Sequence, residues 1–308
     1  MEPFQITAPT ELLECLTHPP QIVETAKGLM EYGEKGEGPV VLSVHGGPGG
    51  YDQGLGLGET FRANGFKIMA VSRPGYLGTP LETGRSCAEQ ADALAASIDA
   101  LGLGKVAVIG ASAGGPASYL LAARHADKVA ALIEIDSVAL KYEIHVSWLE
   151  EKLFLSKAGL WLVNFFLDHF PEAMVKSFLQ AESTLAGQEL NARVKEIVKD
   201  DYKLAWVRFL MATMSEKMDQ RKAGLDNDLQ QLAALGALPV QTIACPTLII
   251  HGAADKDVVP AHAEYAHRAI KNSELYLIPG GSHLGFWTAD TAYEAQEYAV
   301  RWLRGQIQ

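Results

Sequence analysis

Cysteine is scarce in this sequence. The 308 residues include three cysteines, which are widely spaced and odd in number: Cys15, Cys87 and Cys245. Neither a disulfide framework nor a metal-binding motif fits that spacing, and so low a cysteine content is typical of proteins from reducing compartments. We therefore expect no disulfide bonds, no bound metal and a cytoplasmic location.

Basic residues are also in short supply. Lysine and arginine number 26 against 37 aspartates and glutamates, which gives a formal net charge of −11 at pH 7. Nucleic acids and anionic membrane surfaces bind proteins that present a basic face. The charge balance therefore argues against both of them as partners.

No long apolar run is present either. The longest apolar region, residues 153–170, is interrupted by Lys157, Asn164, Asp168 and His169, which makes it too polar to cross a bilayer as a helix. The first five residues lack the basic segment followed by an apolar one that marks a signal peptide. We expect neither an integral membrane segment nor a signal peptide.

What the sequence does contain is a regular alternation of short β-rich runs and helical runs from about residue 21 onward. The length of the chain suits one large core, or a core domain with an insertion. Two short strands are predicted within 21–32, a helix within 87–101, and continuous apolar strands at 39–44, 66–71, 105–109 and 129–135. Apolar strands that alternate with helices predict a doubly wound, mostly parallel sheet that is covered on both faces.

The alternation breaks between residues 139 and 243, where only helices are predicted. Strands resume at 246–250 and 275–278. A helical block inserted late in such a sheet most simply forms a cap over the carboxyl ends of the strands, where open α/β sheets bind ligands. We therefore divide the chain into an α/β core, residues 1–138 and 244–308, and a helical cap or lid, residues 139–243. Residues 1–20 lie outside the pattern.

The most informative motif is Gly110-Ala-Ser112-Ala-Gly114, which directly follows an apolar strand and precedes a helix-forming stretch. In this strand–turn–helix context the G-x-S-x-G pattern predicts a nucleophile elbow, a turn so tight that only small neighbours fit around the serine. The turn would present the Ser112 hydroxyl at the end of the strand, above a helix N-terminus. Because serine is a weak nucleophile at neutral pH, Ser112 needs a base and an oxyanion site.

A glycine-rich loop, His45-Gly-Gly-Pro-Gly-Gly50, follows another predicted strand. Glycines let the backbone approach a reacting centre with its N–H groups aimed at it. We predict that the N–H of Gly47 pairs with the N–H of Ala113 as an oxyanion hole, with Gly46 beside the substrate. The alternative is an ordinary tight loop between a strand and a helix.

An acid and a base follow the last two predicted strands. Asp255 lies on the loop after the strand that ends at Ile250, and His283 on the loop after residue 279. An aspartate placed there can orient a histidine and stabilise its charge. Two rivals for the acid remain open, namely Asp257 on the same loop and Asp136 at the end of the preceding strand.

Together these motifs resemble the serine hydrolases of the α/β-hydrolase superfamily, over roughly residues 21–137 and 244–304, with the chain order Ser112, Asp255, His283. The resemblance implies Ser112 as nucleophile, His283 as general base and then acid, and Asp255 as the orienting carboxylate. The His-Gly-Gly-Pro-Gly-Gly loop is shared with proline iminopeptidases. The sequence departs from these enzymes at Ala113, where they usually have tryptophan, and at 72–76, which looks more like esterases and carbon–carbon bond hydrolases.

The predicted cap is rich in aromatic residues, and these allow two interpretations. They either pack the cap helices onto the core or form an apolar wall above Ser112, and ligand pockets are mostly apolar. From this run we select Trp148, Trp161 and Phe165 as candidate substrate contacts. The methionines Met211, Met214 and Met218 follow helical spacing and are assigned to the core by default, or else to the pocket lining.

Several other polar residues have simpler explanations. We expect His45 to hydrogen-bond its own loop and His251 to brace the loop that holds Asp255. Arg73 either binds a substrate carboxylate or, more commonly for an arginine there, braces neighbouring loops. His18, His125, His262 and His267 are predicted to lie at the surface.

The function that these residues favour is hydrolysis of a carboxylic ester with an apolar acyl or alcohol part, through an acyl-enzyme. The partner would be a small-molecule apolar ester, and no metal or organic cofactor is implied. An iminopeptidase-like aminopeptidase and a carbon–carbon bond hydrolase are alternatives that use the same machinery. A ligand-binding α/β-hydrolase without turnover is a further alternative, disfavoured because such proteins often lose a triad residue. The natural substrate and the oligomeric state stay open.

Overall fold

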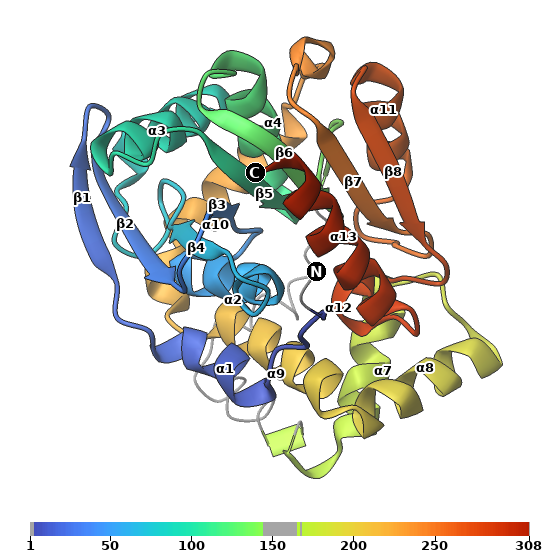
Figure 1. Ribbon diagram of the computed structural model, residues 1–308. Helices are drawn as coiled ribbons and strands as arrows, with labels where there is room; N and C mark the ends of the chain where they lie inside the picture. The colour runs from blue at the N-terminus through green and yellow to red at the C-terminus, as the bar shows by residue number, and fades with distance from the viewer. Residues whose placement is uncertain (1–2, 144–164, 167, 308) are drawn as a thin grey trace.

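The computed structural model describes residues 3–143, 165–166 and 168–307. Its centre is an eight-stranded sheet with the strand order β1-β2-β4-β3-β5-β6-β7-β8 (Figure 1). Strand β2 pairs antiparallel with β1 and β4, and the other neighbouring strands are parallel. The predicted fold class is confirmed. The strands are β1 (Gln21–Thr25), β2 (Gly28–Lys35), β3 (Val40–Val44), β4 (Lys67–Val71), β5 (Val106–Ala111), β6 (Val129–Ile135), β7 (Thr247–Gly252) and β8 (Ser273–Ile278).

Side chains of the central strands alternate between two hydrophobic cores, one on each face of the sheet. Val41 of β3 and Ile109 of β5 belong to one core, whereas Leu42 and Val108 belong to the other. Every residue of β5 and of β7 is buried. Burial on both faces explains why these strands are continuous apolar runs and not alternating ones.

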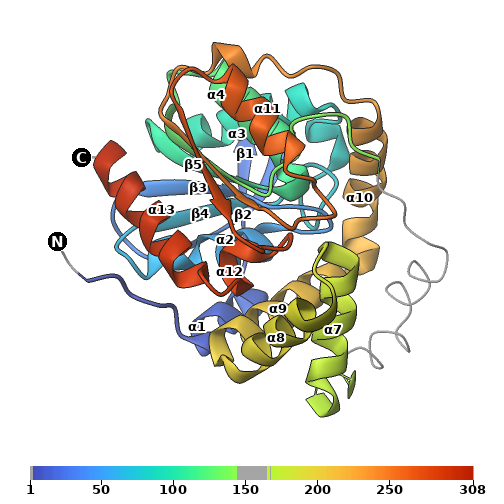
Figure 2. The same ribbon diagram turned by 90° about the vertical axis from the view of Figure 1, so that its right-hand side faces the viewer.

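Helices cover both faces of this sheet, as Figure 2 shows. One face is covered by α3 (Cys87–Ala100), α4 (Gly115–Arg124) and α11 (Ala261–Ala269). The other is covered by α2 (Tyr51–Arg62), α12 (Gly285–Thr288) and α13 (Ala292–Gln306), joined at the edge by α1 (Pro9–Glu14). Short 3₁₀ helices are η1 (Cys15–Thr17), η2 (Leu81–Thr83), η3 (Ser112–Gly114) and η4 (Val240–Thr242).

The segment between β6 and β7 is helical in its described part, as predicted. Its helices are α7 (Pro171–Glu182), α8 (Gly187–Lys199), α9 (Asp201–Ser215) and α10 (Met218–Ala233). Helices α7, α8 and α9 share a small core of their own, which includes Met211. Trp206 and Phe209 of α9 belong instead to the core that α2 and α13 form with the sheet. Helix α9 therefore ties the segment to the rest of the molecule. None of the helices in the described part of the chain is both long and apolar enough to span a membrane.

Candidate active site

The turn after β5 places Ser112 in a left-handed backbone conformation, with φ of 49°. The glycines around it leave no room for side chains. A Cβ on Gly110 would lie 2.1 Å from the Ser118 hydroxyl oxygen, and one on Gly114 would lie 2.5 Å from the carbonyl oxygen of His45. The small residues of the motif are thus required by close packing between β5, α4 and the loop after β3, as an elbow demands.

Three loops at the carboxyl ends of the strands bring a serine, a histidine and an aspartate together. Nε2 of His283 lies 3.0 Å from Oγ of Ser112, and its Nδ1 lies 2.8 Å from Oδ2 of Asp255. Asp255 is 2% exposed, and its other oxygen accepts hydrogen bonds from the backbone N–H groups of Asp257 and Val258. Burial alone would lower the pKa of His283, but the Asp255 carboxylate raises it well above its usual value.

The two rival acids occupy different positions. Oδ1 of Asp136 accepts a hydrogen bond of 2.7 Å from the N–H of Gly252. Burial, followed by repulsion from Asp255, raises the pKa of Asp136 well above its usual value. Asp257 accepts a hydrogen bond from the Tyr142 hydroxyl and places its other oxygen 3.7 Å from Nε2 of His283, on the side of Ser112. Of the three carboxylates, Asp255 is the one bonded to Nδ1.

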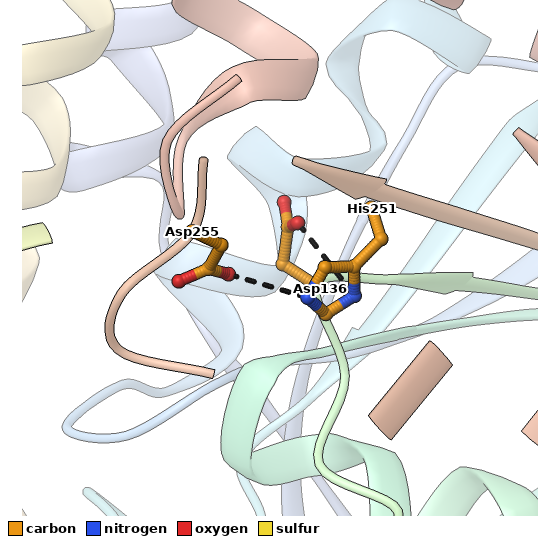
Figure 3. Close-up of side chains that lie close together, drawn as sticks. All are labelled: Asp136, His251 and Asp255. Atoms are coloured by element: carbon orange, nitrogen blue, oxygen red, sulfur yellow. Dashed lines mark ion pairs between the residues drawn. The ribbon is translucent and has the colours of Figure 1, made fainter. Parts of the chain in front are cut away.

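His251 lies between the carboxylates of Asp136 and Asp255 (Figure 3). Its Nε2 donates a hydrogen bond of 2.6 Å to the carbonyl of Val258 and lies 3.5 Å from Asp255, while its Nδ1 lies 3.9 Å from Asp136. Burial lowers the pKa of His251, which favours the neutral ring. The predicted bracing role of His251 is confirmed, because its bond to Val258 closes the loop that carries Asp255.

The glycine-rich loop lies against the elbow. A Cβ on Gly46 would come within 3.1 Å of Cβ of Ser112, and one on Gly47 within 3.4 Å of Cβ of Ala113. Gln53 of α2 holds the loop by accepting from the N–H of Gly46 and donating to the carbonyl of Pro48. Within the described residues, the N–H of Gly47 donates to no protein group. Gly47 and Ser112 line the same cavity.

Ser112 and His283 open into a cavity that also includes Gly46 and Gly47. One part of its wall is apolar, formed by Leu57, Phe178, Trp206, Leu210, Met214, Leu284 and Trp287. Another part is acidic, with Asp136, Glu182 and Asp257. Lysine and arginine are absent from the described lining. The cavity therefore suits an apolar group, and its polar part suits neutral or cationic groups better than anionic ones.

Of the three predicted cap contacts, Phe165 is among the described residues. Trp148 and Trp161 lie outside the described residues. Phe165 is 36% exposed, stacks on His169 and is not part of the cavity lining. Of the methionines, Met214 lines the cavity and Met211 packs among α7, α8 and α9. Sequence reasoning missed Phe178, Leu210, Trp206 and Trp287, which are apolar residues on helices with no local feature that sets them apart.

Two further side chains clarify the earlier alternatives. Arg73 is 1% exposed and bonds the carbonyl groups of His45 and Gly46, which confirms loop bracing over binding of a substrate carboxylate. His45 bonds its own loop, as predicted, through Nδ1 and the carbonyl of Gly46. The surface prediction for His262 is wrong. The residue is 4% exposed, and its Nδ1 accepts from the N–H groups of Ala139 and Leu140, just after β6.

A mostly parallel sheet with serine, aspartate and histidine on the loops after β5, β7 and β8 has the architecture of an α/β hydrolase. Sequence comparison agrees, since the sequence model of the alpha/beta hydrolase fold matches residues 39–290. The chain therefore belongs to the α/β-hydrolase family, and its relatives include esterases.

Three similar proteins illustrate the relationship. The solved structure of an alpha/beta hydrolase fold protein from Nakamurella multipartita is 38% identical, covers 93% of this chain and 99% of its own, and superposes with a TM-score of 0.88. The uncharacterized hydrolase YcgS of Bacillus subtilis is 28% identical over 87% of this chain and 92% of its own. A pimeloyl-[acyl-carrier protein] methyl ester esterase of Neisseria meningitidis serogroup B is 26% identical over 74% of this chain and 80% of its own.

Proposed function

We propose that the protein is a serine carboxylic-ester hydrolase for substrates with an apolar acyl or alcohol part. The observation that supports this most directly is the unbroken hydrogen-bond chain from Ser112 through His283 to Asp255, with Ser112 and His283 in the lining of a largely apolar cavity. The methyl ester esterases among the relatives agree with this reaction type.

The proposed reaction begins with proton transfer from Ser112. Because Nδ1 of His283 donates to Asp255, Nε2 has a lone pair directed at Oγ, 3.0 Å away. Oγ attacks the ester carbonyl carbon as Nε2 takes the proton, and the resulting imidazolium is stabilised by Asp255. The imidazolium then protonates the departing alkoxide, which leaves an acyl-enzyme. Water, deprotonated by His283, cleaves the acyl group by the same route and restores Ser112.

The N–H groups of Gly47 and Ala113 are the proposed donors to the carbonyl oxygen as it gains negative charge. We expect Gly47→Val to lower kcat by about 10²-fold, as loss of one oxyanion donor does in other hydrolases. The added side chain would begin 3.1 Å from Oδ2 of Asp228 and 3.2 Å from the Tyr76 hydroxyl, so the loop or these two side chains must shift. The measurement is kcat for a p-nitrophenyl ester.

Gly236→Val is the matched control, because a Cβ there meets nothing within 4 Å, and it should keep the wild-type rate. A folded Gly47→Val variant with unchanged kcat would show that Gly47 is not a donor.

The apolar wall predicts how the rate depends on acyl length. Each methylene that enters the cavity contributes about 0.8 kcal/mol, so kcat/KM should rise about fourfold per added carbon until the cavity fills. Phe178→Ala and Leu210→Ala, which shorten cavity-lining side chains, should flatten that rise more than they slow p-nitrophenyl acetate hydrolysis. The exposed Phe165→Ala serves as the comparison. A wild-type kcat/KM that falls steadily from acetate onward would contradict an apolar acyl pocket.

An aminopeptidase of the iminopeptidase type is the second candidate. The observation in its favour is that the carboxylates of Glu182 and Asp257 lie near His283 in the cavity. One oxygen of each carboxylate and a ring nitrogen of His283 all lie within 4.8 Å of one another. Such a pair could hold the free amine of a substrate. Comparing kcat/KM for a proline arylamide with that for short p-nitrophenyl esters distinguishes the two functions.

A further inference from the structure

The buried guanidinium of Arg73 bonds two carbonyl groups of the glycine-rich loop. Arg73, on the loop after β4, donates through Nε to the carbonyl of His45 at 3.0 Å and through Nη2 to the carbonyl of Gly46 at 3.1 Å. The second bond matters most, because the carbonyl of Gly46 and the N–H of Gly47 belong to the same peptide group.

The orientation of that peptide follows from these bonds. In a trans peptide the C=O and N–H bonds point in opposite directions. The carbonyl of Gly46 is held by Arg73 and also by Nδ1 of His45, at 2.6 Å. His45 must bear its proton on Nδ1, since its Nε2 accepts from the N–H of Arg73. With the carbonyl held on this side, the N–H of Gly47 faces away from the guanidinium.

The guanidinium is itself held by Asp228 of helix α10. The two carboxylate oxygens accept from Nη1 at 2.8 Å and Nη2 at 2.6 Å, which is a bidentate pair. Exposure of the two side chains is 1% for Arg73 and 4% for Asp228. The Tyr76 hydroxyl donates to the same carboxylate at 2.6 Å. A buried, bidentate pair of this kind fixes the plane of the guanidinium as well as its position.

Helix α10 is docked closely enough to define where Asp228 lies. The N–H of Gly224 donates to the carbonyl of Gly75, and a Cβ on Gly224 would lie 2.3 Å from the Tyr76 ring. The N–H of Leu77 donates to the carbonyl of Gln220. Backbone thus meets backbone between α10 and the Arg73 loop, so the carboxylate has little freedom to move.

We propose that Asp228 is a positioning residue for the oxyanion hole: through Arg73 it orients the Gly46–Gly47 peptide so that the Gly47 N–H faces the oxygen above Ser112. The helical segment between β6 and β7 then contributes to the reaction through Asp228, which holds Arg73, in addition to lining the cavity. This inference rests on the proposed function, since it requires Gly47 to be an oxyanion donor.

The structure offers a matched control on the same helix. Arg221 of α10 forms a second buried bidentate pair with Asp52 of α2, at 3.1 and 2.6 Å, with side-chain exposures of 1% and 2%. This pair also anchors α10 to the core. Apart from Asp52, Arg221 bonds the carbonyl of Glu216; unlike Arg73, it bonds no carbonyl of the glycine-rich loop among the described residues.

The experiment compares Asp228→Asn with Asp52→Asn. Each substitution keeps the side-chain shape but replaces one acceptor oxygen with an NH₂ group that faces the guanidinium. Both variants should lose thermal stability, because a buried arginine loses its ionised partner. We expect only Asp228→Asn to lower kcat, by about 10- to 100-fold with little change in KM, because misplacing an oxyanion donor weakens transition-state binding.

A trifluoromethyl ketone matched to the ester provides the second readout, since its adduct with Ser112 places an oxyanion in the same position. Its inhibition constant should rise in Asp228→Asn by the factor that kcat/KM falls and stay near the wild-type value in Asp52→Asn. If either asparagine variant does not fold, Arg73→Lys and Arg221→Lys replace the pair. Lysine keeps the charge but cannot bond a carboxylate and two carbonyls in the plane that arginine spans.

The inference would be overturned if the two variants compared, Asp228→Asn with Asp52→Asn or Arg73→Lys with Arg221→Lys, changed kcat and ketone binding equally. Both ion pairs would then be only anchors of α10. Failure of the proposed function has a different signature. In that case the wild-type protein would not react with a fluorophosphonate at Ser112 and would not hydrolyse p-nitrophenyl esters. If the wild-type protein is labelled and hydrolyses esters, but the compared variants behave alike, the inference about Asp228 is overturned and the proposed function stands.

Discussion

Replacing Ser112 with alanine is expected to reduce ester hydrolysis by about 10⁴-fold or more while the protein stays folded, because the nucleophile is lost and no acyl-enzyme can form. His283→Ala should reduce kcat to a similar extent, since Oγ then lacks an acceptor for its proton. The two losses should not add in the double variant, because the two groups act in one step. The measurements are kcat for a p-nitrophenyl ester and labelling by a fluorophosphonate.

Ser97→Ala is a suitable control for Ser112→Ala. Ser97 is a buried serine in α3 whose hydroxyl bonds only the carbonyl of Leu94 among the described residues, so its loss should leave kcat and labelling unchanged. If Ser112→Ala kept the wild-type rate and still reacted with the fluorophosphonate, the nucleophile would have to be another residue.

Features with a local physical cause could be predicted from the sequence. The elbow at Ser112 is one, because the close approaches at Gly110 and Gly114 permit only glycine there. The strands are another, because burial on both faces requires the continuous apolar runs seen in β5 and β7. The position of His283 follows from both, since a loop after a parallel strand must emerge at the same edge of the sheet as the elbow.

Features that depend on long-range packing could not be predicted. Arg73 and Asp228 are 155 residues apart, and neither sequence neighbourhood indicates that the two side chains meet. The apolar wall shows the same limit. Phe165 belongs to a conspicuous aromatic run and yet is not part of the cavity lining, whereas Phe178 and Leu210 line the cavity from helices α7 and α9. Residues 1–20 showed no pattern, although α1 buries Leu12 completely.

Three acidic residues lie near the His283 imidazole or near the loop that carries Asp255, and their asparagine variants should differ sharply in kcat/KM. Asp255→Asn should lower kcat/KM by up to about 10⁴-fold at neutral pH, because an amide at that position cannot hold Nδ1–H and stabilise the imidazolium. Burial lowers the pKa of His283 and Asp255 raises it. Removing the carboxylate should therefore also move the rise of kcat/KM with pH, which follows deprotonation of His283, to lower pH.

Asp136→Asn should behave differently, because Asp136 bonds the N–H of Gly252 and not Nδ1 of His283. Burial, with repulsion from Asp255, raises the pKa of Asp136 well above its usual value, so the folded site favours its neutral carboxyl form. Asparagine has the same charge and can still accept from the N–H of Gly252. We expect kcat/KM within about threefold of wild type, since no charge beside the His283–Asp255 pair is lost.

Asp257→Asn should fall between the two. Its carboxylate raises the pKa of His283 by less than Asp255 does, and it lies 3.7 Å from the imidazole on the Nε2 side. We expect a loss of no more than about tenfold and a small shift of the pH profile to lower pH, because the bond that orients Nδ1 stays in place. The decisive comparison is the pH profile of kcat/KM for all three variants. A fully active Asp255→Asn beside an inactive Asp136→Asn would move the acid to the end of β6, and His251 would then have to reorient to let Asp136 reach His283.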